Sequence, residues 1–247
     1  MESDKVAIVT GGSSGLGLAI TKKFVEKGIT TIITARTQSK LDEVKSELGD
    51  KCIPYAFDMD KLDEIPGLIR DIESKFGRID ILVNNAGINM KKEMLEVTDA
   101  EFHKIIQTNV LSLFSISREV AKVMVNQGSG SIINISSMAA IYGIPKVIAY
   151  SASKSAVEGM TRAMAADLSP KGIRVNCIAP GFIKTPMSAK ALDNDPERKN
   201  KVLSRTPLGK MGDPVDIANM AYFLASDESA YLSGTHIPVD GGNSIGF

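Results

Sequence analysis

The sequence predicts an α/β fold: a single domain with a mostly parallel sheet of about seven strands and helices on both faces. Short β-branched runs alternate with longer amphipathic stretches along the whole chain, the pattern of successive βα units. Several of the short runs are almost entirely apolar, as in parallel strands covered on both sides. The length of 247 residues suits one domain with a substantial core.

The strands are expected where β-branched residues cluster between turn residues. Val6-Ala7-Ile8-Val9, the run from Ile79 to Val83, and Ile132-Ile133 are nearly continuous apolar runs, as expected of strands with helices on both sides. The expected strands are residues 5–10, 30–35, 51–57, 79–84, 130–136, 172–179 and 234–239.

Helical periodicity fills the intervals between these strands. The expected helices are residues 16–28, 38–48, 61–76, 100–126, 150–168 and 213–225. Together these units predict an open, doubly wound sandwich of the Rossmann type. Such sheets bind ligands outside the carboxyl ends of their strands, where the strand order reverses, so function is sought where each strand ends.

One long segment, at about 182–212, contains no expected strand. It carries Pro186, Pro196 and Pro207 beside many charged residues. We interpret it as a substrate lobe or lid over the same edge of the sheet, within a single domain that spans 1–247.

The charge balance argues against several classes of partner. Lys+Arg and Asp+Glu number 29 each, and no block of five or six like charges occurs, so neither nucleic acid nor an anionic membrane is expected to bind. No apolar stretch of about 18 residues and no signal-peptide pattern is present, so no membrane span or export is expected.

Cysteine and histidine usage argues against a metal centre. Cys52 and Cys177 each lie in an apolar run, so neither a disulfide framework nor a thiolate metal site is expected, and a cytoplasmic location fits best. His103 and His236 are too far apart in sequence to suggest a ligand pair. We therefore expect no metal.

A glycine-rich turn follows the first strand. Thr10-Gly11-Gly12-Ser13-Ser14-Gly15-Leu16-Gly17 leads directly into a helix, which brings backbone amides and a helix N-terminus to one point. This indicates an anion site, although the spacing is G-x-x-x-G-x-G and differs from the usual dinucleotide fingerprint. A tight turn that needs glycine only for positive φ and close packing is the alternative.

The next two strand ends suggest how a dinucleotide is selected. Arg36 follows the second strand where an acidic residue usually meets the ribose 2′-hydroxyl, so its guanidinium favours NADP(H) over NAD(H). A solvated arginine at the start of the next helix is the alternative. Asp58, after the third strand, either accepts from an adenine amino group or caps a helix. The fourth strand ends in Asn84-Asn85-Ala86-Gly87, which suits close approach to a ribose or forms only a turn.

The chemical groups follow the fifth strand, which ends at Ser136-Ser137. Tyr150 and Lys154 share one face at the start of a helix, since they are four residues apart. A nearby ammonium favours the phenolate, so Lys154 is expected to lower the pKa of Tyr150 toward neutrality, where acid–base catalysis works best. A surface Tyr/Lys pair is the alternative.

Asn109 lies on the buried stripe of the helix expected at 100–126. A buried amide needs partners. It either satisfies the backbone of a neighbouring element or anchors a proton relay beneath the site, and both can hold at once.

Taken together, these motifs resemble the short-chain dehydrogenase/reductase family, over about Val6 to Gly242. The motifs that carry the resemblance are Thr10-Gly11-x-x-x-Gly15-x-Gly17, Asn84-Asn85-Ala86-Gly87, Asn109, Ser137, Tyr150-x-x-x-Lys154 and Pro180-Gly181. The resemblance implies hydride transfer between a nicotinamide and a carbonyl carbon, with Tyr150 as proton donor or acceptor and Ser137 bound to the substrate oxygen. It also implies that Lys154 holds the nicotinamide ribose and that Asn109 holds a water of the proton relay.

The resemblance further implies the cofactor site and the assembly. The implied cofactor-binding residues are Gly11, Ser13, Ser14, Gly15, Leu16, Gly17, Arg36, Asp58, Met59, Asn85, Ala86, Gly87, Tyr150, Lys154, Pro180, Gly181, Ile183 and Thr185. Such proteins are commonly homotetramers, with the helices near 100–126 and 150–168 at a dimer interface.

The substrate prediction rests on two lysines in addition to Ser137 and Tyr150. Lys92 follows the Asn-Asn-Ala-Gly-Ile stretch and Lys146 precedes Tyr150, an arrangement similar to gluconate 5-dehydrogenases. We therefore predict a small polar keto-sugar, sugar acid or hydroxy-ketone. Alternatively, Lys92 begins a solvated helix.

Two other functions are considered. The first is reduction of a 3-oxoacyl thioester of acyl-carrier protein or coenzyme A; the uncharged stretch Asn126-Gln127-Gly128-Ser129-Gly130 argues against the carrier protein without excluding coenzyme A. The second is a non-catalytic, cofactor-sensing role, but relatives of that kind typically lose the tyrosine or lysine that this chain keeps as Tyr150 and Lys154.

Overall fold

A sheet of seven parallel strands forms the centre of the computed structural model, which describes residues 5–192 and 196–246. The strand order is β3-β2-β1-β4-β5-β6-β7, so the order reverses between β1 and β4. The strands are β1 (Val6–Thr10), β2 (Thr30–Ala35), β3 (Cys52–Ala56), β4 (Ile81–Asn84), β5 (Gly130–Ile135), β6 (Ile173–Pro180) and β7 (His236–Val239). The predicted fold class is confirmed.

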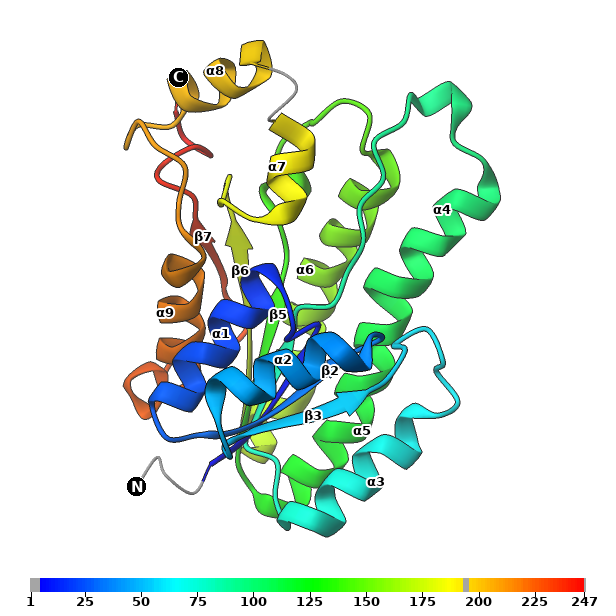
Figure 1. Ribbon diagram of the computed structural model, residues 1–247, viewed down its shortest axis with the longest axis vertical. Helices are drawn as coiled ribbons and strands as arrows, with labels where there is room; N and C mark the ends of the chain where they lie inside the picture. Colours follow the sequence, from blue (N-terminus) through cyan, green and yellow to red (C-terminus); the bar gives the residue numbers. More distant parts are fainter. Residues whose placement is uncertain (1–4, 193–195, 247) are drawn as a thin grey trace.

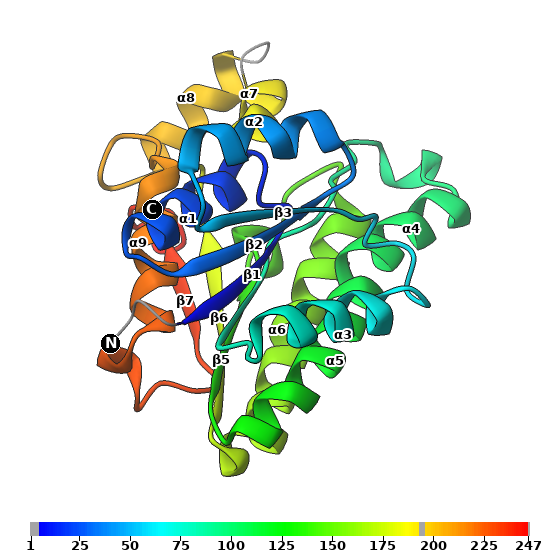
Figure 2. The same cartoon turned by 60° about the horizontal axis from the view of Figure 1, so that its bottom comes forward.

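Helices cover both faces of the sheet. Figure 1 and Figure 2 show α1, α2 and α9 on one face, and α3, α5 and α6 on the other. Their bounds are α1 (Gly15–Glu26), α2 (Gln38–Leu48), α3 (Ile65–Phe76), α5 (Ser112–Gln127), α6 (Ile148–Leu168) and α9 (Pro214–Ala225). Among the described residues, none of the helices has both the length and the apolar character needed to cross a membrane.

The central strands are buried on both sides, as their apolar sequences predict. In β1, Ala7 and Val9 pack in the cluster that contains Phe24 of α1, whereas Ile8 packs on the other side with Ile72 of α3. Burying a side chain of this size contributes about 1.5–3 kcal/mol. The two clusters fix the strands relative to one another, and so fix the arrangement of their carboxyl ends.

Two expected elements begin later than the sequence suggests. The strand expected at 79–84 begins at Ile81, because the Ile79 amide and carbonyl bond to the side chain of Gln127 at 2.8 and 2.9 Å instead of to a neighbouring strand. The helix expected at 61–76 begins at Ile65, where Pro66 occupies the first turn and needs no hydrogen-bond acceptor.

The expectation of one helix over 100–126 is wrong in detail. The structure divides it into α4 (Asp99–Ile106), a π-helical turn at Gln107–Leu111, and α5. A capping box between Thr98 and Glu101 starts α4. The apolar stripe continues across the π turn, so periodicity alone did not reveal it.

The segment expected to form a lobe contains α7 (Pro186–Leu192) and α8 (Pro196–Arg205), which lie beyond the carboxyl end of β6 in Figure 1. The chain near the C-terminus anchors α8. The buried Asn243 amide donates to the carbonyl of Val202 (3.3 Å) and to the hydroxyl of Thr206 (2.8 Å), and its carbonyl accepts from Arg205.

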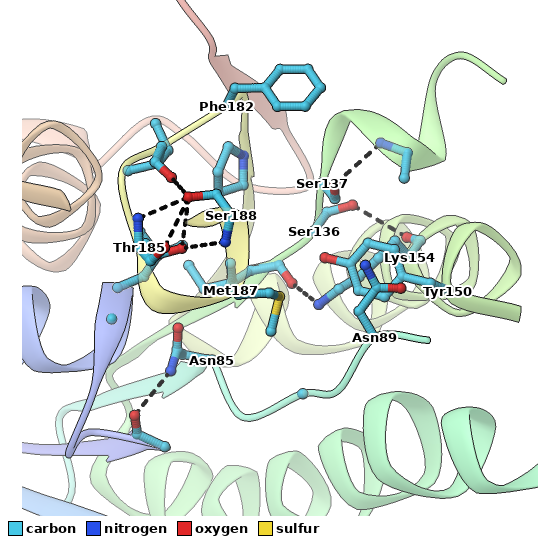
Figure 3. A pocket seen from close by; sticks show the side chains of 18 of the residues that line it. Asn85, Asn89, Ser136, Ser137, Tyr150, Lys154, Phe182, Thr185, Met187 and Ser188 are labelled. Carbon is cyan, nitrogen blue, oxygen red and sulfur yellow. Dashed lines mark hydrogen bonds between the residues drawn. The ribbon is translucent and has the colours of Figure 1, made fainter. Parts of the chain in front are cut away.

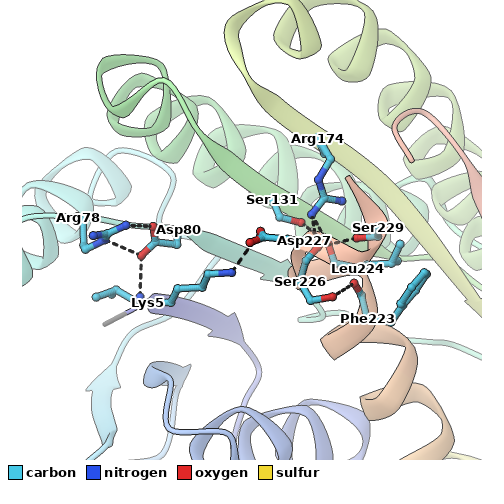
Figure 4. Close-up of polar contacts among 11 residues, drawn as sticks. Lys5, Arg78, Asp80, Ser131, Arg174, Phe223, Leu224, Ser226, Asp227 and Ser229 are labelled. Carbon is cyan, nitrogen blue, oxygen red and sulfur yellow. Dashed lines mark hydrogen bonds and ion pairs between the residues drawn. The ribbon is translucent and has the colours of Figure 1, made fainter. Parts of the chain in front are cut away.

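Polar contacts close the opposite end of the sheet (Figure 4). The Asp80 carboxylate accepts from the backbone amide of Val6 at 2.8 Å and from the guanidinium of Arg78 at 2.6 and 2.8 Å. On the other side, Arg174 of β6 donates to the carbonyl of Leu224 at the end of α9. These bonds connect the strand starts to the loops around them.

Replacing Asp80 by alanine is expected to lower the free energy of unfolding by about 2–3 kcal/mol, because it removes the acceptor of the buried Val6 amide and two bonds of Arg78. Urea denaturation measures the loss. Asp227→Ala is the control, since the exposed Asp227 carboxylate lies 3.6 Å from Lys5 and its removal should have no measurable effect. Equal losses in both variants would contradict this account.

Candidate active site

The turn after β1 forms a cradle that fits a phosphate group. Gly11 (φ +66°) and Gly15 (φ +53°) adopt left-handed conformations. A Cβ atom at Gly17 would lie 2.3 Å from the Gly11 carbonyl oxygen, so only glycine allows this close approach. Because α1 begins at Gly15, its free amides and positive end lie at the turn.

Thr10 joins the ends of β1 and β4, a role that the sequence did not reveal. Its buried hydroxyl accepts from the amides of Asn85 and Ala86, each at 3.0 Å. The Asn85 side chain donates back to the Thr10 carbonyl at 2.9 Å. The signal was a threonine at the last position of a buried strand, directly before the glycine turn. These bonds place the Asn85–Gly87 stretch next to the cradle.

A cavity of about 330 Å³ extends from this turn past the ends of β4, β5 and β6. In Figure 3, Ser137, Tyr150 and Lys154 lie on one side, opposite Thr185 and Met187. The predicted site residues that line the cavity are Gly11, Ser14, Gly15, Leu16, Asn85, Ala86, Gly87, Ser137, Tyr150, Lys154, Pro180, Gly181, Ile183 and Thr185.

Other predicted cofactor residues do not line this cavity. Gly17 shapes the turn, and Ser13 lies within it. Arg36 is exposed at the end of β2, the strand next to β1. Asp58 accepts from the amide of Asp60 at 3.1 Å, so it stabilises a local turn. Met59 is buried, and its sulfur accepts from the hydroxyl of Thr34.

The two lysines predicted to contact the substrate lie outside the cavity lining. Lys92 donates to both carboxylate oxygens of Glu101, at 2.8 and 2.9 Å, and with bonds from Thr98 it lowers the pKa of Glu101 to about 2. Lys146 pairs with Glu93. Sequence could not anticipate these pairs, because they depend on how the loop after β4 folds back on α4 and on the loop before α6. The contact of either lysine with a substrate stays a prediction.

The buried ammonium of Lys154 connects α6 to β5. It donates to the carbonyl oxygen of Ile135 at 2.7 Å and lies 5.6 Å from the centre of the Tyr150 ring. Burial lowers the pKa of Lys154 to about 8, because the charged form loses its hydration.

Burial also dominates the acidity of Tyr150. It raises the pKa of the Tyr150 hydroxyl, and a hydrogen bond with Ser137 acts in the opposite direction. The expected net lowering of this pKa by Lys154 does not occur in the structure. The ammonium lies against the ring and is directed to the Ile135 carbonyl, and its own charged form is disfavoured.

Asn109 lies in the π turn, behind the cavity. Its side chain accepts from the amide of Ile88 (2.8 Å) and donates to the carbonyl of the same residue (2.9 Å). It also donates to the hydroxyl of Ser153 at 3.0 Å. The side chain thus satisfies a neighbouring backbone, one of the two possibilities that the sequence left open, and it holds the loop after Gly87 against α6.

Thr185, a predicted site residue, also has a structural role that sequence reasoning missed. Thr185 caps α7: its hydroxyl accepts from the Ser188 amide at 3.2 Å, and its own amide donates to Ser188 at 2.9 Å. Thr-Pro before a short helix was the available signal. The lining residues that sequence reasoning missed are mostly apolar; they are Asn89, Ile135, Ser136, Ala139, Ile144, Val147, Phe182, Pro186, Met187 and Ser188.

Comparison with known proteins agrees with this geometry. The family model described as enoyl-(acyl carrier protein) reductase matches residues 11–244. The 3-oxoacyl-[acyl-carrier-protein] reductase FabG of Thermotoga maritima is 40% identical, over 96% of this chain and 97% of its own. The 3α-hydroxysteroid dehydrogenase of Mediterraneibacter gnavus is 41% identical, over 98% and 97%. The 2-dehydro-3-deoxy-D-gluconate 5-dehydrogenase of Formosa agariphila is 36% identical, over 96% and 92%.

Solved structures carry both kinds of nicotinamide cofactor. A 7α-hydroxysteroid dehydrogenase complexed with NADH and 7-oxo-glycochenodeoxycholic acid has a TM-score of 0.92 at 36% identity, covering 96% of this chain and 93% of its own. A Beutenbergia cavernae protein with bound NADP has a TM-score of 0.92 at 34% identity, covering 96% of each chain.

Fold and cavity define a nicotinamide-dependent oxidoreductase that acts on small molecules. The chain belongs to the short-chain dehydrogenase/reductase family.

Replacing Lys154 by methionine is expected to stabilise the protein at pH 7. The unfolded chain holds the lysine proton more tightly than the folded one, whose pKa is about 8, so the charged lysine costs about 3 kcal/mol at pH 7. After loss of the bond to Ile135, a net gain of about 1–2 kcal/mol remains.

The same linkage predicts that wild-type stability rises between pH 8 and about 10, and that Lys154→Met removes this rise. Urea denaturation at pH 7 and 9.5 measures both effects. The exposed Lys171→Met is the control, with neither effect expected. A variant less stable than the wild type at both pH values would show that the buried ammonium is not a source of instability.

Proposed function

We propose that the protein is an NADP(H)-dependent enzyme that interconverts a carbonyl and a secondary alcohol. The observation that carries this proposal is the grouping of Ser137, Tyr150 and Lys154 on one side of a cavity that begins at the glycine turn. When bound, the nicotinamide supplies or takes up the hydride. The chain provides binding, orientation and proton transfer.

Tyr150 handles the proton in this proposal. In the reducing direction its hydroxyl donates a proton to the substrate oxygen, while the Ser137 hydroxyl donates a hydrogen bond to the same oxygen. Burial raises the pKa of Tyr150, so the hydroxyl is protonated at neutral pH, which suits reduction. Lys154 holds the cofactor ribose, and Asn109 positions the loop and helix on either side of it and holds a water of the proton relay.

Arg36 supports the choice of NADP(H). It is exposed at the carboxyl end of β2, next to the strand that carries the glycine turn. Its planar donor group suits a 2′-phosphate, and an acidic residue for a 2′-hydroxyl is missing from that position.

The cavity supports a substrate with an apolar portion beside its carbonyl. Ile144, Val147, Phe182 and Met187 are among the residues that line the cavity. Two relatives are named for a 3-oxoacyl group and a hydroxysteroid, both of which are mainly apolar near the reacting oxygen. We therefore favour an apolar ketone or a 3-oxoacyl thioester over a keto-sugar acid.

Assembly and location complete the proposal. We assign the protein a homotetrameric state, supported by exposed apolar side chains of Leu111 and Phe114 on the helices expected at an interface. We also assign it to the cytoplasm, since Cys52 and Cys177 are both free and buried.

Tyr150→Phe should lower kcat by about 10² to 10⁴-fold, because it removes the proton donor and leaves the cavity shape intact. Steady-state turnover and fluorescence titration with NADPH measure the two effects separately, and NADPH binding should change less than threefold. Tyr55→Phe is the control: it removes a hydroxyl on β3 that is bonded to Asp71, away from the cavity. If Tyr150→Phe retains most of its activity, Tyr150 is not the acid.

Arg36→Ala should weaken NADPH binding by roughly 10- to 100-fold, because charge-assisted hydrogen bonds to the phosphate are lost. NADH binding should change little. Isothermal titration with each cofactor measures the ratio, and the exposed Arg70→Ala of α3 is the control. If Arg36→Ala weakened NADPH and NADH binding equally, the assignment of Arg36 to the 2′-phosphate would be wrong.

A further inference from the structure

A polar layer lies between α6 and the carboxyl half of the sheet, beneath Ser137 and Tyr150. Strand register assigns its members to one face. Asn134 of β5 pairs with Cys177 of β6, which pairs with His236 of β7, and Ser136 follows Asn134 by two residues on the same face.

Glu158 of α6 is at the centre of this layer. The buried hydroxyl of Ser136 donates to its carboxylate oxygen Oε1 at 2.8 Å. His236 Nε2 lies 3.2 Å from the same oxygen, and the Glu158 side chain is only 14% exposed. Ser136 Oγ is also 3.3 Å from the carbonyl oxygen of Lys154, a longer contact.

The chemistry of the layer requires these partners. A carboxylate this far from water needs donors, and Ser136 provides one. His236 Nε2 is buried and makes no hydrogen bond among the described residues, so its 3.2 Å approach to Glu158 Oε1 is a close polar contact only. Lys154 and Cys177 face the same layer, and burial, followed by the charge of Glu158, raises the pKa of Cys177 to about 12.

The bond between Ser136 and Glu158 joins the two elements that carry the reacting groups. Ser136 directly precedes Ser137, and its amide donates to the Ile178 carbonyl at 2.8 Å. Glu158 lies one helical turn after Lys154, whose ammonium bonds the Ile135 carbonyl. The Ser136–Glu158 and Lys154–Ile135 bonds together prevent α6 from rotating against the end of β5, which either bond alone would allow.

We propose that Glu158 is a positioning residue that fixes Ser137 relative to Tyr150 through its bond with Ser136. The inference rests on the proposed function, since it concerns the alignment of the two groups that act on the substrate oxygen. Glu158 lies one residue layer below the cavity and does not line it.

Turnover of variants tests this role. Glu158→Leu should lower kcat by about 10- to 100-fold, the cost of a small misplacement of reacting groups, with KM and NADPH binding changed less than threefold. Glu158→Gln keeps an oxygen acceptor for Ser136 and should stay within threefold of the wild type. Ser136→Ala should match Glu158→Leu, and the double variant should lose no more than either alone.

Thr161→Val is the matched control. Thr161 is buried in α6 one turn further on and bonds Asn134 instead of Ser136, so its removal perturbs the same layer and should leave kcat within threefold. The proposal would be overturned if Thr161→Val lowered kcat as much as Glu158→Leu. It would also be overturned if the losses in the double variant were additive, or if Glu158→Gln were as slow as Glu158→Leu.

A readout without cofactor or substrate separates this inference from the proposed function. Ser137 lowers the pKa of Tyr150 through a hydrogen bond, so misplacing Ser137 should move the titration of Tyr150 to higher pH. Substitution of all tyrosines by 3-fluorotyrosine lowers the phenol pKa and allows ¹⁹F detection, with Tyr150→Phe to assign the signal.

In this titration Glu158→Leu and Ser136→Ala should shift Tyr150 upward, and Glu158→Gln and Thr161→Val should not. An unchanged Tyr150 titration in Glu158→Leu would overturn the inference even if the wild type is active. If these variants shift the Tyr150 titration but the wild type reduces no carbonyl, the positioning role of Glu158 stands and the proposed function is overturned.

Discussion

The site depends on the burial of one ammonium group between α6 and β5. Lys154 directs its charge to the carbonyl of Ile135 rather than to a carboxylate, so it remains a strained cation with a pKa of about 8. The first turns of the helix are held in place by bonds to two elements: Ser153 to the π turn and Lys154 to β5. These bonds set the first turns of α6 at the cavity, where Tyr150 meets Ser137. Stability is lost at Lys154 because its charged form is buried without a carboxylate partner.

Features that depend on residues close together in the sequence were predictable, and features that depend on contacts between distant segments were not. Strand positions were predictable because burial on both faces leaves apolar runs that are visible locally. The glycine turn and the Tyr150–Lys154 pair were predictable for the same reason, since each is a short motif. The π turn was not, because the spacing of Ile105, Leu113 and Ile116 across it matches an uninterrupted helix.

Side-chain pairing was not predictable from the sequence. Lys92 and Lys146 pair with Glu101 and Glu93, which come close only in the folded loops. Pairing changes the interpretation of the cavity from a cationic to a mainly apolar one. Likewise, the role of Thr10 required the adjacency of β1 and β4, which strand order determines and periodicity does not.

The central claim is hydride transfer from NADPH to an apolar carbonyl. The most direct test is transfer of deuterium from NADPH labelled at C4 in a competition among acetoacetyl-coenzyme A, an alicyclic ketone and 5-ketogluconate, with products analysed by mass spectrometry. We expect one deuterium on the carbinol carbon of the thioester or alicyclic product, at least tenfold faster than on the sugar acid. A label mainly in the sugar acid would contradict the apolar-substrate account, and no label in any product would contradict hydride transfer to these carbonyls.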